Sequence, residues 1–143
     1  MTATADHAEG QRDAAAKLGV KAGHTVQEIG FDDDCDADLR ASVEAACGSE
    51  LLDEYADDVV DVVLLWWRDE DGDLGDALVD AIGLLAENGV VWLLTPKPGR
   101  DGHVDSEDIA EAAPTVGLQQ TSTVSAARDW QGTRLVSPRL GRR

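Results

Sequence analysis

Apolar residues follow one another most closely in two runs near the middle of the chain. Eight of the nine residues at 59–67 are apolar, and Asp61 is the exception. A run rich in β-branched residues and bounded by charges indicates a strand buried on both faces, as in a parallel sheet covered by helices. Residues 89–95 form a second such run. Trp66 and Trp67 are expected to point to opposite faces of the first strand.

The segment between these runs has the spacing of an amphipathic helix. Over residues 73–87, apolar side chains recur every three or four positions and most acids lie outside that stripe. Asn88 and Gly89 are expected to end this helix. A strand, a helix and a strand of these lengths predict a right-handed βαβ crossover.

The N-terminal part of the chain predicts further alternation of helix and strand. We expect a short helix over residues 9–18, a strand over 25–30 and a helix that ends near Cys47. Residues 50–55 are consistent with either a short strand or a turn of helix.

The C-terminal part predicts one helix and a hairpin. Asp105 and Asp108 resemble a capping pair for a helix over residues 106–113. Strands over 118–126 and 130–136 are expected to close one edge of the sheet as an antiparallel pair. The expected fold class is therefore α/β, with a three-layer Rossmann-like, mostly parallel sheet and a C-terminal antiparallel hairpin.

Length and composition indicate a single domain. With 143 residues, of which 43% are hydrophobic, the chain can bury an ordinary core. We expect the domain to span residues 9–138, with a mobile N-terminus at 1–8 and a mobile basic tail at 139–143. No apolar run reaches the ~18 residues of a membrane span, and the first residues lack the features of a secretory signal.

Charge is the strongest compositional signal. The net charge of −17 argues against nonspecific binding to nucleic acid or to anionic membranes. Residues 1–127 carry 7 basic and 28 acidic side chains, whereas residues 128–143 carry 5 basic and 1 acidic. Solubility explains the acidity, and the alternative is a docking face for a basic protein partner. The basic tail is either a solvated terminus or a docking peptide.

Cysteine and aspartate usage gives no metal or disulfide motif. Cys35 and Cys47 are too few for a disulfide framework, and reduced thiols in a cytoplasmic protein are expected. Asp32, Asp34 and Asp36 are spaced like the start of a calcium loop, but its later positions lack the required glycine and glutamate. We therefore expect no designed metal site.

The loops after the parallel strands are the expected location of any ligand site. Lys97 and Arg100 could hold a carboxylate or phosphate, and His103 could act as a general base. The alternative is a set of solvated loops and helix caps. The candidate ligand-binding residues are Glu28, Gly30, Asp32, Asp34, Arg68, Lys97, Arg100 and His103.

Three segments resemble the S-adenosylmethionine-dependent methyltransferases. In LGVKAGHTVQEIGF, the residues Glu28 and Gly30 stand where that family has an acid and a glycine at its first strand. VVDVVLLWW resembles the family's fourth strand, with Asp61 at its usual acid, and LLAENGVVWLLTPKPGR resembles the leader and fifth strand. The resemblance covers residues 14–138. More closely, the chain resembles a small acidic actinobacterial family of unknown function.

The chain departs from the methyltransferase pattern where the cofactor would bind. The family's motif has three glycines after the first strand, but here Gly30 is followed by Phe31 and three aspartates. These add bulk and negative charge beside the position of the cofactor's carboxylate. Only about 28 residues separate the first strand from Val59, where a full methyltransferase fits two strands and two helices.

These departures favour a degenerate scaffold. The expected role is a non-catalytic intracellular binding or regulatory module with a protein partner and no cofactor. Two alternatives stay open: a small enzyme that binds S-adenosylmethionine or another small molecule, and a homo-oligomeric structural protein.

Overall fold

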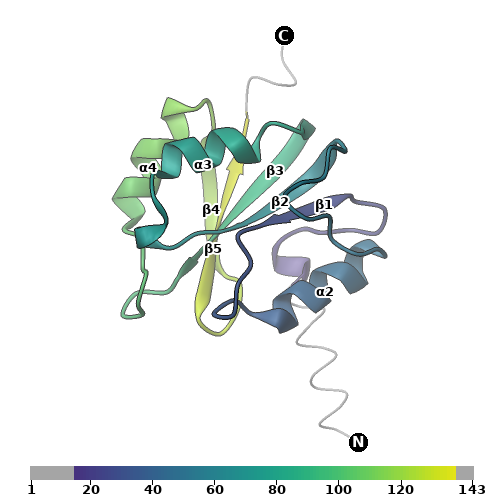
Figure 1. Ribbon diagram of the computed structural model, residues 1–143, viewed down its shortest axis with the longest axis horizontal. Coiled ribbons are helices and arrows are strands. Elements are labelled where there is room, and N and C mark those ends of the chain that lie inside the picture. The colour runs from purple at the N-terminus through teal and green to yellow at the C-terminus, as the bar shows by residue number, and fades with distance from the viewer. Residues whose placement is uncertain (1–14, 138–143) are drawn as a thin grey trace, which may run out of the picture.

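The computed structural model describes residues 15–137 (Figure 1). The predictions for residues 1–8 and 139–143, and for most of the helix at 9–18, lie outside this range. Residues 15–17 are helical, and Gly19 follows with φ 71°. This is the left-handed conformation expected of a glycine that ends a helix.

The described chain forms a five-stranded sheet in the order β1-β2-β3-β5-β4. The strands are β1 Val26–Ile29, β2 Val60–Trp66, β3 Leu85–Pro96, β4 Gln119–Ser125 and β5 Trp130–Val136. β1, β2 and β3 are parallel, while β5 runs antiparallel to both β3 and β4. The predicted parallel sheet with an antiparallel C-terminal hairpin is therefore confirmed.

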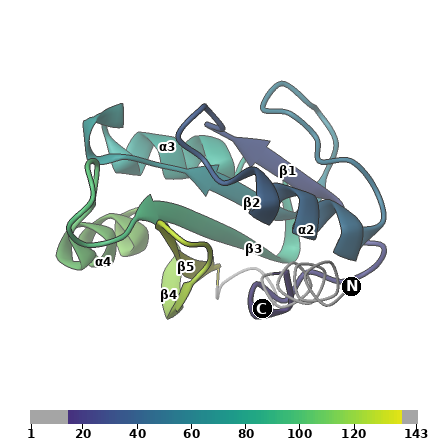
Figure 2. The same cartoon turned by 90° about the horizontal axis from the view of Figure 1, so that it is seen from below.

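Helices cover both faces of the sheet (Figures 1 and 2). The helices are α2 Ala37–Cys47, α3 Leu74–Ala81 and α4 Ser106–Thr115. Side chains of α2 pack on one face of the sheet, and side chains of α3 and α4 pack on the other. This arrangement confirms the predicted three layers.

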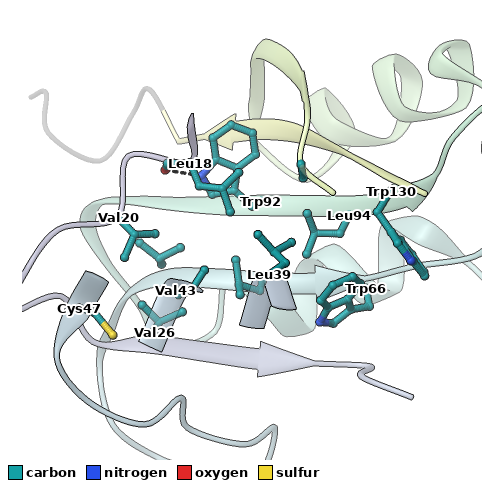
Figure 3. Close-up of a cluster of buried hydrophobic side chains, with 13 residues drawn as sticks. Leu18, Val20, Val26, Leu39, Val43, Cys47, Trp66, Trp92, Leu94 and Trp130 are labelled. Carbon is teal, nitrogen blue, oxygen red and sulfur yellow. Dashed lines mark hydrogen bonds between the residues drawn. The ribbon is translucent and has the colours of Figure 1, made fainter. Parts of the chain in front are cut away.

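Trp66, the last residue of β2, and Trp67, which follows it, point to opposite faces of the sheet, as predicted. Trp66 lies in the cluster beneath α2 (Figure 3), whereas Trp67 packs against the cluster beneath α3 and α4. The ring of Trp66 meets Trp130 edge to face at 4.9 Å between centroids. Because β5 is the neighbour of β3, this contact connects the hairpin to the parallel part of the sheet.

The helix predicted over residues 73–87 is too long. α3 ends at Ala81, and β3 begins at Leu85 because this residue pairs with Val60. The register then shifts before Val90 pairs with Val62. Asn88, with φ 68°, and Gly89 lie in this shifted segment, so they mark an irregularity within a strand rather than the end of a helix.

The helices α2 and α4 begin with different cap arrangements. Asp36 begins α2 and its carboxylate accepts from the backbone N–H of Leu39 at 2.9 Å, while Gly48 ends the helix with φ 86°. Asp105 precedes α4, but its side chain makes no capping bond, so the predicted pair with Asp108 is wrong. The backbone N–H of Asp108 bonds the backbone carbonyl of Asp105 instead.

The ambiguous segment at residues 50–55 contributes a single bridge. Leu52 pairs in parallel with Gln27 on the outer side of β1. Two backbone hydrogen bonds, from Glu28 to Leu52 and from Leu52 to Val26, hold it there. This single bridge is what the chain forms in the segment where the resembled family fits two strands and two helices.

Candidate functional site

Arg68 lies at the carboxyl end of β2 and joins the loops around it. Its side chain is 11% exposed, and Nε and Nη2 bind the two carboxylate oxygens of Asp34 at 3.0 and 2.6 Å. Nη1 donates to the carbonyl oxygen of Gly30 at 3.0 Å. A two-pronged arginine–carboxylate pair of this kind is both strong and geometrically specific. It connects the loop after β1 to the loop after β2.

The remaining donors of Arg68 also have acceptors within the protein. Nη1 lies 3.3 Å from the Trp66 carbonyl oxygen and 3.3 Å from Oδ2 of Asp71. The guanidinium carbon stands 5.3 Å from the ring centroid of Trp130. All three guanidinium nitrogens therefore have internal partners, which leaves little capacity to bind an external anion.

The ion pair stabilises the charged forms of Asp34 and Arg68. The hydrogen bond from Arg68 lowers the pKa of Asp34, with burial as the largest opposing effect. The same bond raises the pKa of Arg68. Burial raises the pKa of the neighbouring Cys35 thiol to about 12. Cys35 is therefore protonated near neutral pH and a poor nucleophile.

Gly30 is required where the ends of β1 and β2 approach each other. Its φ is 83°, and a Cβ at this position would lie 2.6 Å from the carbonyl oxygen of Trp66. The N–H of Gly30 donates to Oε1 of Glu54 at 3.3 Å. The glycine that carries the methyltransferase resemblance is thus explained here by the packing of two strand ends.

Glu28 is bound on both of its carboxylate oxygens. Oε1 accepts from Nε of Arg40 at 2.9 Å, and Oε2 accepts from Nε1 of Trp66 at 3.0 Å. Hydrogen bonding to Glu28 raises the pKa of Arg40, whose guanidinium carbon lies 3.7 Å from the centroid of the Phe31 ring. With Glu28 only 7% exposed, the carboxylate serves as a buried acceptor between β1, β2 and α2.

A hollow of about 370 Å³ lies beside the Arg68–Asp34 pair. Its lining residues come from three loops, the end of β3 and the start of β5, and they are Asp34, Pro96, Gly99, Arg100, Asp101, Asp129 and Trp130. Nη1 of Arg100 pairs with Oδ1 of Asp129 at 3.2 Å. The lining carries three carboxylates against one guanidinium, so the hollow is better suited to a cationic group than to an anion.

Only part of the predicted residue set meets at this hollow. Asp34 and Arg100 line it, and Arg68 holds Asp34 in place. Lys97 instead reaches Oγ of Ser125 at 2.6 Å. The loops after β1, β2 and β3 do gather at one end of the sheet, but the cations on them do not converge on a common ligand position.

Two other candidate residues, His103 and Asp32, also bond groups close to them in sequence. Nδ1 of His103 lies 2.9 Å from the carbonyl oxygen of Pro96. Asp32 accepts from the backbone N–H of Asp33 at 2.8 Å and is exposed. Neither side chain lines the hollow.

Trp130 and Asp129 complete the site and were not predicted for it. Nε1 of Trp130 donates to the backbone carbonyl oxygen of Asp34 at 3.1 Å. The signal was present in the topology, because an antiparallel last strand begins at the edge where the parallel strands end. The prediction of the hairpin therefore already contained the position of Trp130.

Residues 15–137 contain neither a metal-binding cluster nor a membrane-spanning helix. No three histidine, cysteine or acidic side chains in this range are placed to share a metal ion. None of the helices in the same range combines the length and apolarity needed to cross a bilayer.

The sheet order and the C-terminal hairpin define a Rossmann-like fold of the methyltransferase type. A S-adenosylmethionine-dependent methyltransferase from Aquifex aeolicus superimposes with a TM-score of 0.58 at 12% identity, over 89% of this chain and 89% of that one. A methyltransferase from Thiobacillus denitrificans, in complex with S-adenosyl-L-homocysteine, gives 0.57 at 10% identity over 90% and 91%. At these identities the similarity is one of fold.

The chain belongs to the family described as "Protein of unknown function (DUF3052)", which matches residues 15–139. An uncharacterized protein of Mycobacterium tuberculosis is 57% identical over 141 residues, which cover 97% of this chain and 87% of the relative. Both parts of the predicted resemblance, to the methyltransferase fold and to a small family of unknown function, are therefore confirmed.

Proposed function

We propose that this protein is a non-catalytic intracellular binding or regulatory module built on a methyltransferase-like scaffold. The observation that carries the proposal is the bond between Arg68 and Asp34. Asp34 belongs to the loop after β1, where the resembled family has bare glycine backbone beside its cofactor. Here a carboxylate occupies that loop and a buried arginine holds it.

Opening a cofactor crevice between the loops after β1 and β2 would require several bonds to break together. Separation of the loops would remove the bidentate ion pair, the bond from Arg68 to the Gly30 carbonyl and the bond from Trp130 to the Asp34 carbonyl. Because Asp34 is 55% exposed, solvent screens the ion pair, and its loss alone costs about 1 kcal/mol, to which the two other bonds add. A ligand would have to offset this cost before any net affinity appeared.

The acidic surface supports a basic protein as the partner. Of the charged groups at the hollow, Asp34, Asp101 and Asp129 outnumber Arg100. The whole chain carries a net charge of −17. Such a field attracts and orients a basic surface, and its effect falls steeply with ionic strength.

A small enzyme that binds S-adenosylmethionine is the second candidate. It is favoured by the fold and by Gly30, which keeps a positive φ at the end of the first strand. This function requires the Arg68–Asp34 pair to open, whereas the binding module keeps it closed. Ligand binding to the wild-type protein therefore separates the two candidates.

The deciding experiment is a calorimetric titration with S-adenosylmethionine at ~1 mM, which detects binding as weak as about −4 kcal/mol. The binding module predicts no saturable heat and no thermal shift for the wild type. As a matched comparison, Asp34→Gly removes the carboxylate and places a glycine in the loop. Saturable binding to the wild type would establish the small-molecule candidate and end the proposal.

The partner is tested by affinity capture from extract of the source cells at low and high salt. A basic partner is expected at low salt and should be lost at high salt, because the attraction between exposed charges is screened. Capture of nothing specific at either salt would count against a binding module.

A further inference from the structure

β4 forms the outer edge of the sheet and is open to a further strand. It pairs with β5 on one side, and no described residue pairs with its other side. All residues of β4 except Val124 are exposed. The strand lies at the far end of the sheet from β1, away from α2 (Figure 2).

This edge lacks the charges that usually protect an exposed strand. Residues 112–127 contain no Asp, Glu, Lys, Arg or His, although 29% of the chain is charged. Natural edge strands are commonly blocked by charges, prolines or bulges, because their free backbone groups pair readily with other chains. β4 has only a register shift between Gln120 and Ser122.

The charged side chains that hydrogen-bond to residues of β4 come from other parts of the chain and are positive. Nζ of Lys97 lies 2.6 Å from Oγ of Ser125, and Nζ of Lys17 lies 3.4 Å from the Ser125 carbonyl oxygen. Nη1 of Arg134 lies 3.1 Å from Oγ1 of Thr121. The β4 edge is therefore a neutral strip with cations at its border on an otherwise acidic molecule.

We infer that β4 pairs with β4 of a second copy of this chain, in antiparallel orientation about a two-fold axis. Two copies with a net charge of −17 repel each other, and like charges directly opposite one another destabilise a strand pair. Along β4 the two copies meet without opposing acids. Antiparallel pairing of one strand with itself is isologous, so the assembly closes as a dimer with a sheet continuous across both copies.

This self-association does not rest on the proposed function and responds oppositely to salt. Screening weakens the repulsion between two acidic copies, so the dimer should tighten from ~50 mM to ~500 mM salt. Attraction to a basic partner should weaken over the same range. Self-association through β4 and binding of a basic partner can therefore be refuted independently of each other.

The test is sedimentation equilibrium of the full chain at both salt concentrations. Thr123→Asp places one carboxylate on the β4 edge of each copy, whereas Val79→Asp adds the same charge at an exposed position on α3. We expect Thr123→Asp to raise the dimer Kd about tenfold or more and Val79→Asp to leave it within about twofold.

Backbone hydrogen exchange tests the same pairing without a substitution. In the wild type, protection of amides within residues 119–125 should rise with protein concentration, because pairing buries their free N–H groups. A monomer at all concentrations, an open-ended assembly, equal weakening by both variants, or protection that does not depend on concentration would each overturn the inference.

Discussion

Nε1 of Trp66 donates a 3.0 Å hydrogen bond to Oε2 of Glu28, which joins the last residue of β2 to the middle of β1. Trp66 is 1% exposed and Glu28 is 7% exposed, so neither group has ready access to water. Arg40 binds the other carboxylate oxygen and connects the pair to α2. The acid of the methyltransferase-like first strand therefore has a structural role here.

Replacement of Glu28 should show this role as a loss of stability. Glu28→Ala leaves the Trp66 N–H without its acceptor and Arg40 without its partner, and we expect unfolding to become easier by about 2–4 kcal/mol. Glu28→Gln keeps an acceptor and should lose less than half of that. Urea unfolding followed by tryptophan fluorescence measures both variants. An equal loss in both would contradict the importance of the Trp66 bond.

Gly30 and Gly117 have nearly the same backbone conformation and different surroundings. Their φ values are 83° and 86°, but an added Cβ at Gly30 would meet the Trp66 carbonyl oxygen at 2.6 Å, whereas Gly117 has nothing within 4 Å. Gly117→Ala should cost about 1–2 kcal/mol for the left-handed conformation alone. Gly30→Ala should cost at least about 1 kcal/mol more, because the strand ends must also separate. Thermal unfolding of both variants measures the difference, and equal costs would contradict the close approach.

Asp34 should make stability depend on pH. Because Arg68 lowers the pKa of folded Asp34, this carboxylate stabilises the fold fully above its unfolded pKa of ~3.9, and the contribution disappears as pH falls through the folded pKa. Since the side chain is 55% exposed, solvent screening limits the effect, and we expect Asp34→Asn to cost about 1 kcal/mol near pH 7. The difference from wild type should shrink below about pH 4.

Denaturant titrations at several pH values measure this difference. Asp33→Asn is the matched control, since Asp33 is exposed and makes no ion pair among the described residues. It should leave stability within about 0.5 kcal/mol of wild type at every pH. A constant offset between Asp34→Asn and wild type would show that the ion pair does not carry the pH dependence.

The two central strands, β2 and β3, could be anticipated because each contains a continuous apolar run. The end of α3 could not be predicted, because residues 82–87 continue the helical spacing and only the pairing of Leu85 with Val60 draws them into the sheet. That pairing is a long-range contact, which local propensity does not report. Asn88 and Gly89 do mark a break in regular structure, but the break lies within a strand and not at the end of a helix.

The location of the candidate site could be predicted from the sequence, but most of its contacts could not. The rule for open α/β sheets correctly brought together the loops that contain Asp34, Arg68 and Arg100. The partner of each cation could not be predicted from the neighbouring residues. Arg68 pairs with Asp34, 34 positions earlier, whereas Lys97 bonds Ser125 of β4. Several acids surrounded each cation in sequence, so only the folded geometry could identify the partner.

Cys35 provides a chemical measure of whether this loop stays closed. Burial raises the pKa of its thiol to about 12, against ~8.5 for a free cysteine, so the thiolate fraction at pH 8 should be lower by about a thousandfold. In a Cys47→Ser background, alkylation of the folded protein should be slower than alkylation in denaturant by a similar factor. The denatured sample is the control for intrinsic reactivity.

If Cys35 of the folded protein is alkylated at a rate within tenfold of the rate in denaturant, the prediction of a closed loop is contradicted. It would mean that Cys35 spends much of its time exposed, although its thiol lies 2.9 Å from Nη2 of Arg68 in the closed loop. Cys35 is partly exposed in the closed loop, and fuller exposure requires the loop to move away from Arg68, which would also free Asp34. Fast alkylation would therefore weaken the case for a closed crevice and favour the small-molecule candidate, whereas slow alkylation supports a loop held shut by its own ion pair.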